Sequence, residues 1–242
     1  MASVTSASLE KKQSNFVHGL QAGISIAIGY MPAALTFGLL AKSTGLTLYE
    51  TVLTSLIVFA GAAQYIFLSL LAVGTGAIEI IFTTFIVNIR HFLMSASLSE
   101  KIESDHLWKK ALYSFGLTDE TFSVASLKSG KVTTGYMFGL ILISYSSWVI
   151  NSGLGHVIGA SLPKIIQESM SIALYAMFIG LLIPTLKKQR KVLFLAVTAA
   201  VFNSICVATG YISTGWGIVI STIAAAVLIE FIYLKGVRNH VE

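Results

Sequence analysis

Ionisable residues stand almost alone inside two long apolar runs of this chain. Arg90 and His91 lie within one run, and Asp119 and Glu120 lie in the middle of another. A charge near the centre of a bilayer costs roughly 2.5–3.5 kcal/mol on insertion scales, so such residues normally face the interior of a helix bundle or a polar cavity. The pattern therefore indicates a polar pathway through a bundle of membrane helices.

The composition is typical of a polytopic membrane protein. Of the 242 residues, 55% are hydrophobic and only 11% are charged, whereas about 25% are charged in soluble domains. This leaves too little polar surface for a soluble globule of this size. The net charge of +5 does not indicate nucleic-acid binding, because the basic residues cluster in short loops between apolar runs.

Eight apolar segments are predicted to span the membrane, and most have the roughly 17–25 residues that a spanning helix needs. The fourth is short and contains the two acidic residues, so a topology of seven spans without it is the alternative. The predicted spans are 18–40, 50–73, 77–98, 111–127, 133–152, 166–186, 191–209 and 215–234.

The basic residues outside the spans favour the eight-span topology. With eight spans and a cytoplasmic N-terminus, ten basic residues lie inside and five lie outside, as the positive-inside rule requires. Removing the fourth span would move the four basic residues between 187 and 191 to the side opposite the N-terminus. We therefore expect a multi-pass protein with both termini in the cytoplasm.

The sequence divides into three parts. Residues 1–15 form a polar tail that we predict to be disordered, 16–235 a single transmembrane domain, and 236–242 a short cytoplasmic tail. The first part has no apolar core of a signal peptide, so no cleaved signal is expected. Phe37–Leu40 resembles Ile179–Leu182, and each is followed by a further span and a Thr-Gly turn. These copies would run oppositely through the membrane, which makes an inverted repeat a candidate feature of the fold.

Two of the predicted helices carry interruptions. Pro32, two residues after Tyr30, removes a helix hydrogen bond from the first span. Gly61 to Gln64 place small residues and one amide in the second span. Broken helices in transporters often mark the substrate site because unwound backbone offers free polar groups there. Close helix packing is the alternative interpretation for all glycine-rich segments, including the Gly-x-x-x-Gly pairs Gly135/Gly139 and Gly155/Gly159.

The third span carries a polar stripe. Thr84, Asn88, His91 and Ser95 are spaced 4, 3 and 4 residues apart and share one helical face. One interpretation is a cavity wall that binds a polar substrate, with His91 able to exchange protons near neutral pH. The other is hydrogen bonding between helices.

Arg90 points away from this stripe and needs a partner of its own. Asp119 and Glu120 are the nearest acidic residues within predicted spans, and a buried pair relieves the unfavourable burial of each charge. We expect Arg90 to pair with one of them across neighbouring helices, either for gating and coupling or as a purely structural ion pair. Extension of Arg90 to the membrane surface is the alternative.

Signatures of enzymes are absent from the sequence. It contains no His-Glu-x-x-His, no Gly-x-Ser-x-Gly and no P-loop. The five histidines are scattered without metal-ligand spacing. We predict no catalytic residues, no metal site and no cofactor.

Four motifs occur in chain order and resemble the AzlC family of azaleucine-resistance permeases over roughly residues 15–235. They are Gly29-Tyr30-Met31-Pro32-Ala33-Ala34 with Phe37-Gly38, Ala60-Gly61-Ala62-Ala63-Gln64, Asn88-Ile89-Arg90-His91, and Gly116-Leu117-Thr118-Asp119-Glu120-Thr121-Phe122. The resemblance implies a secondary exporter of leucine, isoleucine, valine and often methionine in the bacterial inner (plasma) membrane. It also implies a small AzlD-like membrane subunit as partner. Some members carry aspartate where this chain has Asn88, so an acidic proton carrier is not implied at that position.

The chemistry of a zwitterionic amino acid fits the polar residues of these motifs. Its ammonium needs acceptors, its carboxylate needs donors, and a branched side chain needs an apolar pocket. We predict coupling to the proton motive force. A transporter or channel for another small solute or ion is the alternative function, and a membrane enzyme or an assembly subunit is a third. The candidate residues for substrate binding or coupling are Tyr30, Pro32, Gln64, Asn88, Arg90, His91, Asp119 and Glu120.

Overall fold

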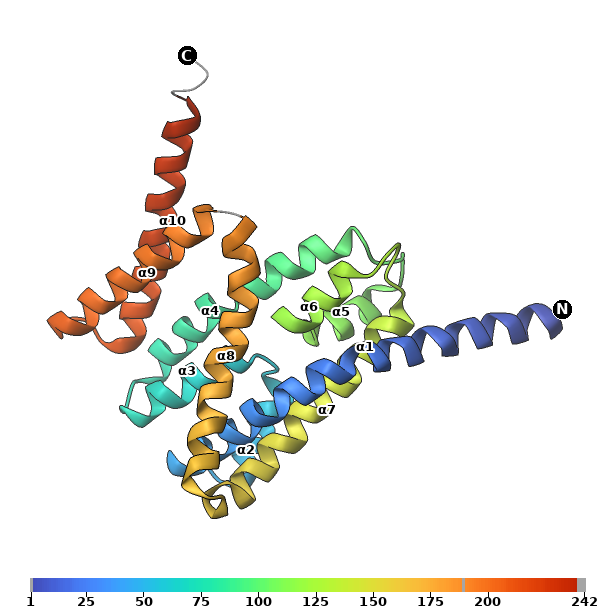
Figure 1. The fold of residues 1–242 in the computed structure, drawn as a ribbon, viewed down its shortest axis with the longest axis horizontal. Helices are drawn as coiled ribbons and strands as arrows, with labels where there is room; N and C mark the ends of the chain where they lie inside the picture. Colours follow the sequence, from blue (N-terminus) through green and yellow to red (C-terminus); the bar gives the residue numbers. More distant parts are fainter. Residues whose placement is uncertain (1, 189, 239–242) are drawn as a thin grey trace. The chain divides into compact units, whose positions relative to one another are not determined.

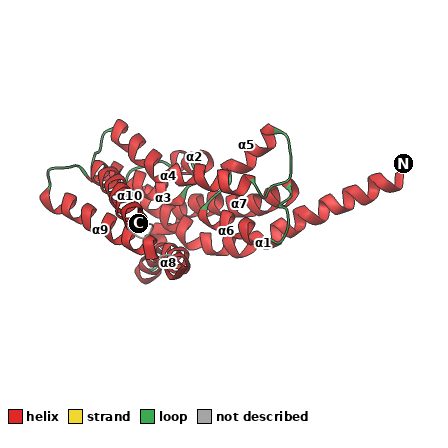
Figure 2. Ribbon diagram, turned by 90° about the horizontal axis from the view of Figure 1, so that it is seen from above, coloured by secondary structure: helices red, strands yellow, loops and turns green. Residues whose placement is uncertain are grey.

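The computed structural model describes residues 2–188 and 190–238, which are built of helices joined by short loops (Figure 1). Figure 2 shows no strand in this part of the chain, so the predicted all-α class is confirmed. The elements are α1 (Ala2–Ser43), α2 (Leu48–Ile57), α3 (Gly61–Ala72), α4 (Ala77–Ser99), α5 (Leu107–Phe115), α6 (Asp119–Leu127), α7 (Thr134–Ile158), the 3-10 turn η1 (Gly159–Ser161), α8 (Lys164–Lys188), α9 (Arg190–Thr209) and α10 (Thr214–Arg238).

Five helical segments among the described residues are long and apolar enough to cross a membrane, and they match the first, third, fifth, seventh and eighth predicted spans. The sixth predicted span corresponds to α8, which has 25 residues. The second and fourth are each made of two shorter helices, and the total of eight spans stays a prediction. The five segments are Asn15–Ser43, Ala77–Ser99, Thr134–Ser161, Arg190–Thr209 and Thr214–Leu234.

The chain forms two compact units. The first contains Met1–Tyr65 and Asn88–Met177, and the second contains Ile66–Val87 and Phe178–Glu242. All eight candidate site residues belong to the first unit. The division into a tail, one transmembrane domain and a cytoplasmic end stays a prediction, although α1 is helical from Ala2 onward.

The core of the first unit is the contact between α1 and α7, which lie side by side (Figure 1). Glycines bring the two backbones together. A Cβ atom added to Gly19 of α1 would lie 2.1 Å from the Tyr136 carbonyl oxygen, and one added to Gly155 of α7 would lie 2.1 Å from that of Leu35. The packing role predicted for the Gly-x-x-x-Gly pairs is thus confirmed at Gly155 and also at Gly139, which lies against the backbone of α1.

The two helices run parallel. Gly19 lies against Tyr136 and Gly38 lies against Ser152, so residue numbers rise in the same direction along both. Parallel spans require an odd number of crossings between them. The eight-span topology has three crossings there, whereas the seven-span alternative has two and would make α1 and α7 antiparallel.

The predicted break at Pro32 is wrong, because α1 continues through this residue to Ser43. Proline removes the backbone donor to the carbonyl of Ile28, a loss that membrane helices tolerate. Thr36 Oγ1 donates to the Pro32 carbonyl at 2.9 Å, and Tyr65 donates to the Ala33 carbonyl at 2.7 Å. The Tyr65 bond ties the segment after Pro32 to α3.

The second predicted span is interrupted as expected. Helix α2 ends at Ile57 and α3 begins at Gly61. Two carbonyl groups at this break are already bonded to side chains, however. Tyr145 of α7 donates to the Leu56 carbonyl at 2.7 Å, and Gln64 donates to the Val58 carbonyl.

The fourth predicted span is not a single helix either. It consists of α5 and α6, separated at 116–118. Asp119 and Glu120 are therefore in the first turn of α6 and not in the middle of a helix.

In the second unit, α9 packs against α10. The carboxylate of Glu79 lies at the start of α10, where Oε1 accepts from Ser213 Oγ at 2.5 Å and from the Trp216 amide at 3.0 Å. A carboxylate at this position compensates for the unpaired amides and the positive end of the helix.

Candidate functional site

The candidate site is built around the break between α5 and α6. Gly116 is required there, because an added Cβ would lie 2.2 Å from a side-chain carbon of Ile141. Thr118 then caps α6: its Oγ1 accepts from the Thr121 amide at 3.2 Å, and Thr121 Oγ1 accepts from the Thr118 amide at 2.8 Å. Thr121 Oγ1 also donates to the Gly116 carbonyl at 3.0 Å. These bonds hold the break in one conformation.

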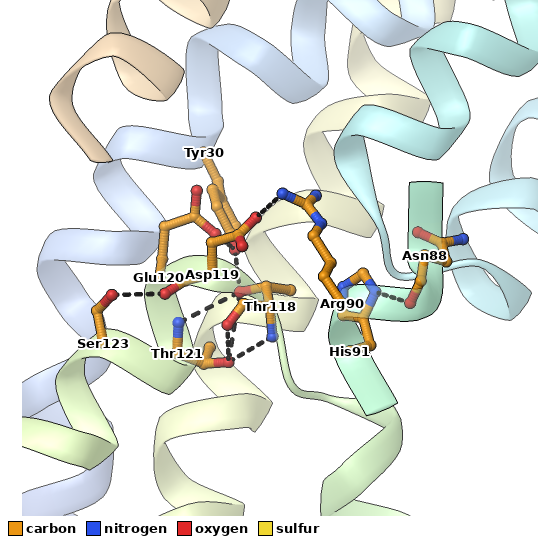
Figure 3. Close-up of polar contacts among 9 residues, drawn as sticks. All are labelled: Tyr30, Asn88, Arg90, His91, Thr118, Asp119, Glu120, Thr121 and Ser123. Atoms are coloured by element: carbon orange, nitrogen blue, oxygen red, sulfur yellow. Dashed lines mark hydrogen bonds and ion pairs between the residues drawn. The ribbon is translucent and has the colours of Figure 1, made fainter. Parts of the chain in front are cut away.

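The capped helix presents two carboxylates at its N-terminal end, where the helix dipole favours negative charge. The two side chains have different partners (Figure 3). Asp119 Oδ2 lies 2.6 Å from Arg90 Nη1 of α4, which confirms the predicted pairing. Glu120 Oε2 accepts from the Tyr30 hydroxyl of α1 at 2.7 Å. Three helices distant in sequence therefore meet at this point.

Tyr30 is the buried centre of the cluster. Its hydroxyl also lies 2.6 Å from Thr118 Oγ1. Its ring packs edge-on against Trp148 of α7 and against Phe59, with centroid separations of 5.2 and 6.0 Å. Burial of the ring leaves the phenol in contact with protein groups on both sides, which fixes its hydroxyl between Thr118 and Glu120.

Arg90 is not fully satisfied by its ion pair. Its Nε is buried and has no hydrogen-bond partner among the described residues. A buried donor without a partner is unfavourable by about 1–3 kcal/mol, unless a ligand or water bonds to it. The Arg90 side chain therefore has a donor available beside the carboxylates.

The other residues of the polar stripe on α4 are not drawn into the cluster. His91 Nδ1 lies 3.1 Å from the Asn88 carbonyl oxygen in the same helix. The Asn88 side chain points away from Arg90 and Asp119 (Figure 3), and its Oδ1 is buried without a partner among the described residues. Neither side chain contacts the carboxylates in the drawn network.

Gln64 is engaged in the structure of the α2–α3 break. Its Oε1 accepts from Trp148 Nε1 at 3.0 Å, and its Nε2 donates to the Val58 carbonyl. The side chain is buried, so both ends of the amide are already bonded to protein. Gln64 is connected to the cluster through Trp148, which touches Tyr30.

The structure thus brings together half of the predicted site. Tyr30, Arg90, Asp119 and Glu120 form one connected cluster, whereas Pro32, Gln64, Asn88 and His91 are structural or lie apart. Thr118 and Trp148 also belong to this cluster but were not among the predicted site residues. A capping threonine followed by two acidic residues is a typical start of a helix and would have revealed the role of Thr118. The sequence carried no comparable signal for Trp148.

The described residues contain no group of three or more His, Cys, Asp or Glu side chains that could hold a metal ion. The chemistry of the cluster is that of charges and hydroxyl groups. It can bond to a carboxylate through Arg90, and to an ammonium or a proton through Asp119 and Glu120.

Comparison with known proteins places this arrangement in a family. Residues 25–162, which contain the cluster, match the family model described as AzlC protein. An uncharacterized membrane protein of Archaeoglobus fulgidus is 34% identical, covering 73% of this chain and 78% of that protein. The inner membrane protein YgaZ of Escherichia coli is 31% identical, covering 78% and 80%. The branched-chain amino acid transport protein AzlC of Bacillus subtilis is 27% identical, covering 69% and 66%. No solved structure matches the chain.

Proposed function

Since this chain belongs to the AzlC family, we propose that it is a secondary transporter that exports branched-chain amino acids. Leucine, isoleucine and valine are the proposed substrates, with methionine as a further candidate. The Bacillus subtilis relative is named as a branched-chain amino acid transport protein, and this supports the substrate class. Export is proposed to be driven by the proton motive force.

The observation that carries the proposal is the Arg90–Asp119 ion pair at a helix break, with the unpartnered Nε of Arg90 beside it. An α-carboxylate needs strong donors, and a guanidinium supplies them in a fixed planar geometry. The α-ammonium needs acceptors, which the carboxylates at the start of α6 supply. Substrate sites of transporters commonly lie at interrupted helices of this kind.

We further propose that the chain acts as the large subunit of a two-component permease in the bacterial inner membrane, with both termini in the cytoplasm. Its partner is a small AzlD-like membrane subunit. Many apolar side chains of α4 and α9 are exposed in the isolated chain, including Phe92, Leu93 and Val197. Such side chains suit contact with lipid or with another membrane helix.

The test is the loss of labelled leucine from preloaded cells that produce the chain, the small subunit, both or neither. We expect the fastest loss with both, and we expect an uncoupler of the proton gradient to slow it. Arg90→Ala should reduce the rate to that of cells without the chain. If valine, isoleucine and leucine are all retained while another solute or ion leaves the cells, the alternative function is correct and the amino-acid proposal is wrong.

A further inference from the structure

We propose that Glu120 carries the coupled proton, that Asp119 is the fixed partner of Arg90, and that the Tyr30 and Thr118 hydroxyls relay the protonation of Glu120 to the start of α6. This inference rests on the proposed proton-driven transport. It assigns different tasks to two adjacent carboxylates that the sequence alone does not distinguish.

The partners of the two carboxylates are the first argument. Asp119 lies 2.6 Å from a guanidinium group, which stays protonated in proteins. A proton on Asp119 would leave the Arg90 charge uncompensated, and an uncompensated partly buried charge is strongly unfavourable. Glu120 accepts instead from the neutral phenol of Tyr30 at 2.7 Å. A proton can therefore join Glu120 without breaking an ion pair.

The count of hydroxyl protons is the second argument. Tyr30 has one hydroxyl proton, and while Glu120 is ionised this proton is donated to Glu120 Oε2. Tyr30 Oη must then act as the acceptor in its 2.6 Å contact with Thr118 Oγ1. Thr118 Oγ1 in turn accepts from the Thr121 amide. Each hydrogen bond from Glu120 to the cap of α6 consequently has a defined direction.

Protonation of Glu120 allows this direction to reverse. The neutral carboxyl group gains an O–H that it can donate to Tyr30 Oη. Tyr30 then donates to Thr118 Oγ1, and Thr118 must donate elsewhere. Thr121 Oγ1, at 3.3 Å, is the acceptor at hand. The proton on Glu120 thus changes the bonding of the two threonines that hold the break between α5 and α6.

The remaining charged and titratable groups around the cluster do not compete for this role. From α1 the group facing Glu120 is Tyr30, and from α4 Arg90 is paired to Asp119. On α7, Tyr145 donates to the Leu56 carbonyl and His156 is bonded to Thr51, at 2.7 and 2.9 Å. His91 of α4 contacts the Asn88 carbonyl of its own helix. Glu120 is itself half-buried, so solvent or the substrate pathway can reach it.

The experiment uses the full chain with its small subunit in proteoliposomes that enclose a pH-sensitive dye. Two rates are measured: exchange of labelled leucine between the two sides at equal pH, and leucine accumulation driven by a pH gradient. Glu120→Gln should lose at least about tenfold more of the gradient-driven accumulation than of the exchange at equal pH, together with the leucine-dependent dye signal. Asp119→Asn should lower both rates, because Arg90 loses its partner. Glu100→Gln, an exposed site in another loop, serves as control.

Gradient-driven accumulation by Glu120→Gln at the parental rate would overturn the inference, as would equal loss of exchange and accumulation in a folded variant. Should Glu120→Gln fail to fold, Tyr30→Phe gives the answer. It removes the phenol donor and should shift the pH dependence of net transport while exchange at equal pH continues. An unchanged pH profile in Tyr30→Phe also overturns the inference. If the parent protein moves no leucine in either assay, the proposed function fails instead.

Discussion

Trp148 Nε1 donates a hydrogen bond to Gln64 Oε1 at 3.0 Å, which ties α7 to the break between α2 and α3. An added Cβ at Gly61 would lie 2.8 Å from the Trp148 ring, so the indole fits into the space that this glycine leaves. The same ring packs edge-on against Tyr30. Trp148 therefore links the α2–α3 break to Tyr30 of the cluster.

This relationship predicts that Gln64→Leu destabilises the fold without a specific effect on substrate affinity. The substitution leaves the Trp148 N–H and the Val58 carbonyl without partners, which is unfavourable by about 1–3 kcal/mol. Trp148→Phe should have a similar effect because Gln64 Oε1 loses its donor. Unfolding of the purified variants in detergent measures both. The double variant should lose less free energy of unfolding than the two single variants lose together. If the losses are strictly additive, the hydrogen bond contributes nothing to stability.

The ion pair gives a second prediction. Arg90→Ala should destabilise the protein by about 1–3 kcal/mol, less than the loss of a fully buried pair, because the two side chains are 35% and 24% exposed. It should also abolish leucine transport. The matched control is the pair of Lys191 with Glu230 in the second unit, whose side chains are 39% and 55% exposed. Lys191→Ala should change stability by less than about 1 kcal/mol. Equal effects of the two substitutions would contradict a special role for Arg90.

The features of this arrangement that follow from a local physical requirement were predictable from the sequence, and those that depend on tertiary contacts were not. The Arg90 pairing was predictable, because an isolated charge in hydrocarbon needs a partner. The break near Gly61 was also predictable from its small residues. The break predicted at Pro32 was wrong, since the loss of one backbone donor does not end a helix that tertiary contacts such as the Tyr65 bond hold in place. Tertiary contacts of this kind are not visible in a single sequence.

Acidification should destabilise the folded conformation of the loop that precedes α5. Asp105 accepts hydrogen bonds from Lys109 and Thr134, and these hold the pKa of its carboxyl well below its usual range. A carboxyl group whose pKa is lower in the folded than in the unfolded protein stabilises the fold at pH values above its unfolded pKa of about 3.9. This stabilisation is lost as the pH falls from that value toward the pKa of the folded state. The Thr134 bond ties the loop to the start of α7.

The measurement is the unfolding midpoint of the parent and of Asp105→Asn between pH 7 and pH 3. The variant should be less stable at pH 7, and the difference should shrink below about pH 4. Glu100→Gln, in the same loop and exposed, should follow the parent at every pH. A constant difference between the parent and Asp105→Asn down to pH 3 would assign the effect to packing and not to charge.

The glycine contacts between α1 and α7 give the last prediction. A Cβ at Gly155 would lie 2.1 Å from a backbone carbonyl oxygen, whereas a Cβ at Gly29 of α1 meets no atom within 4 Å. Gly155→Ala must push the helices apart and should destabilise the protein by about 1–3 kcal/mol or more. Gly29→Ala should be neutral or stabilising by up to about 1 kcal/mol, because alanine favours helix. Unfolding in detergent compares the two variants directly. If Gly155→Ala is as stable as Gly29→Ala, the close parallel packing of α1 and α7, and the odd number of crossings that it requires, must be abandoned.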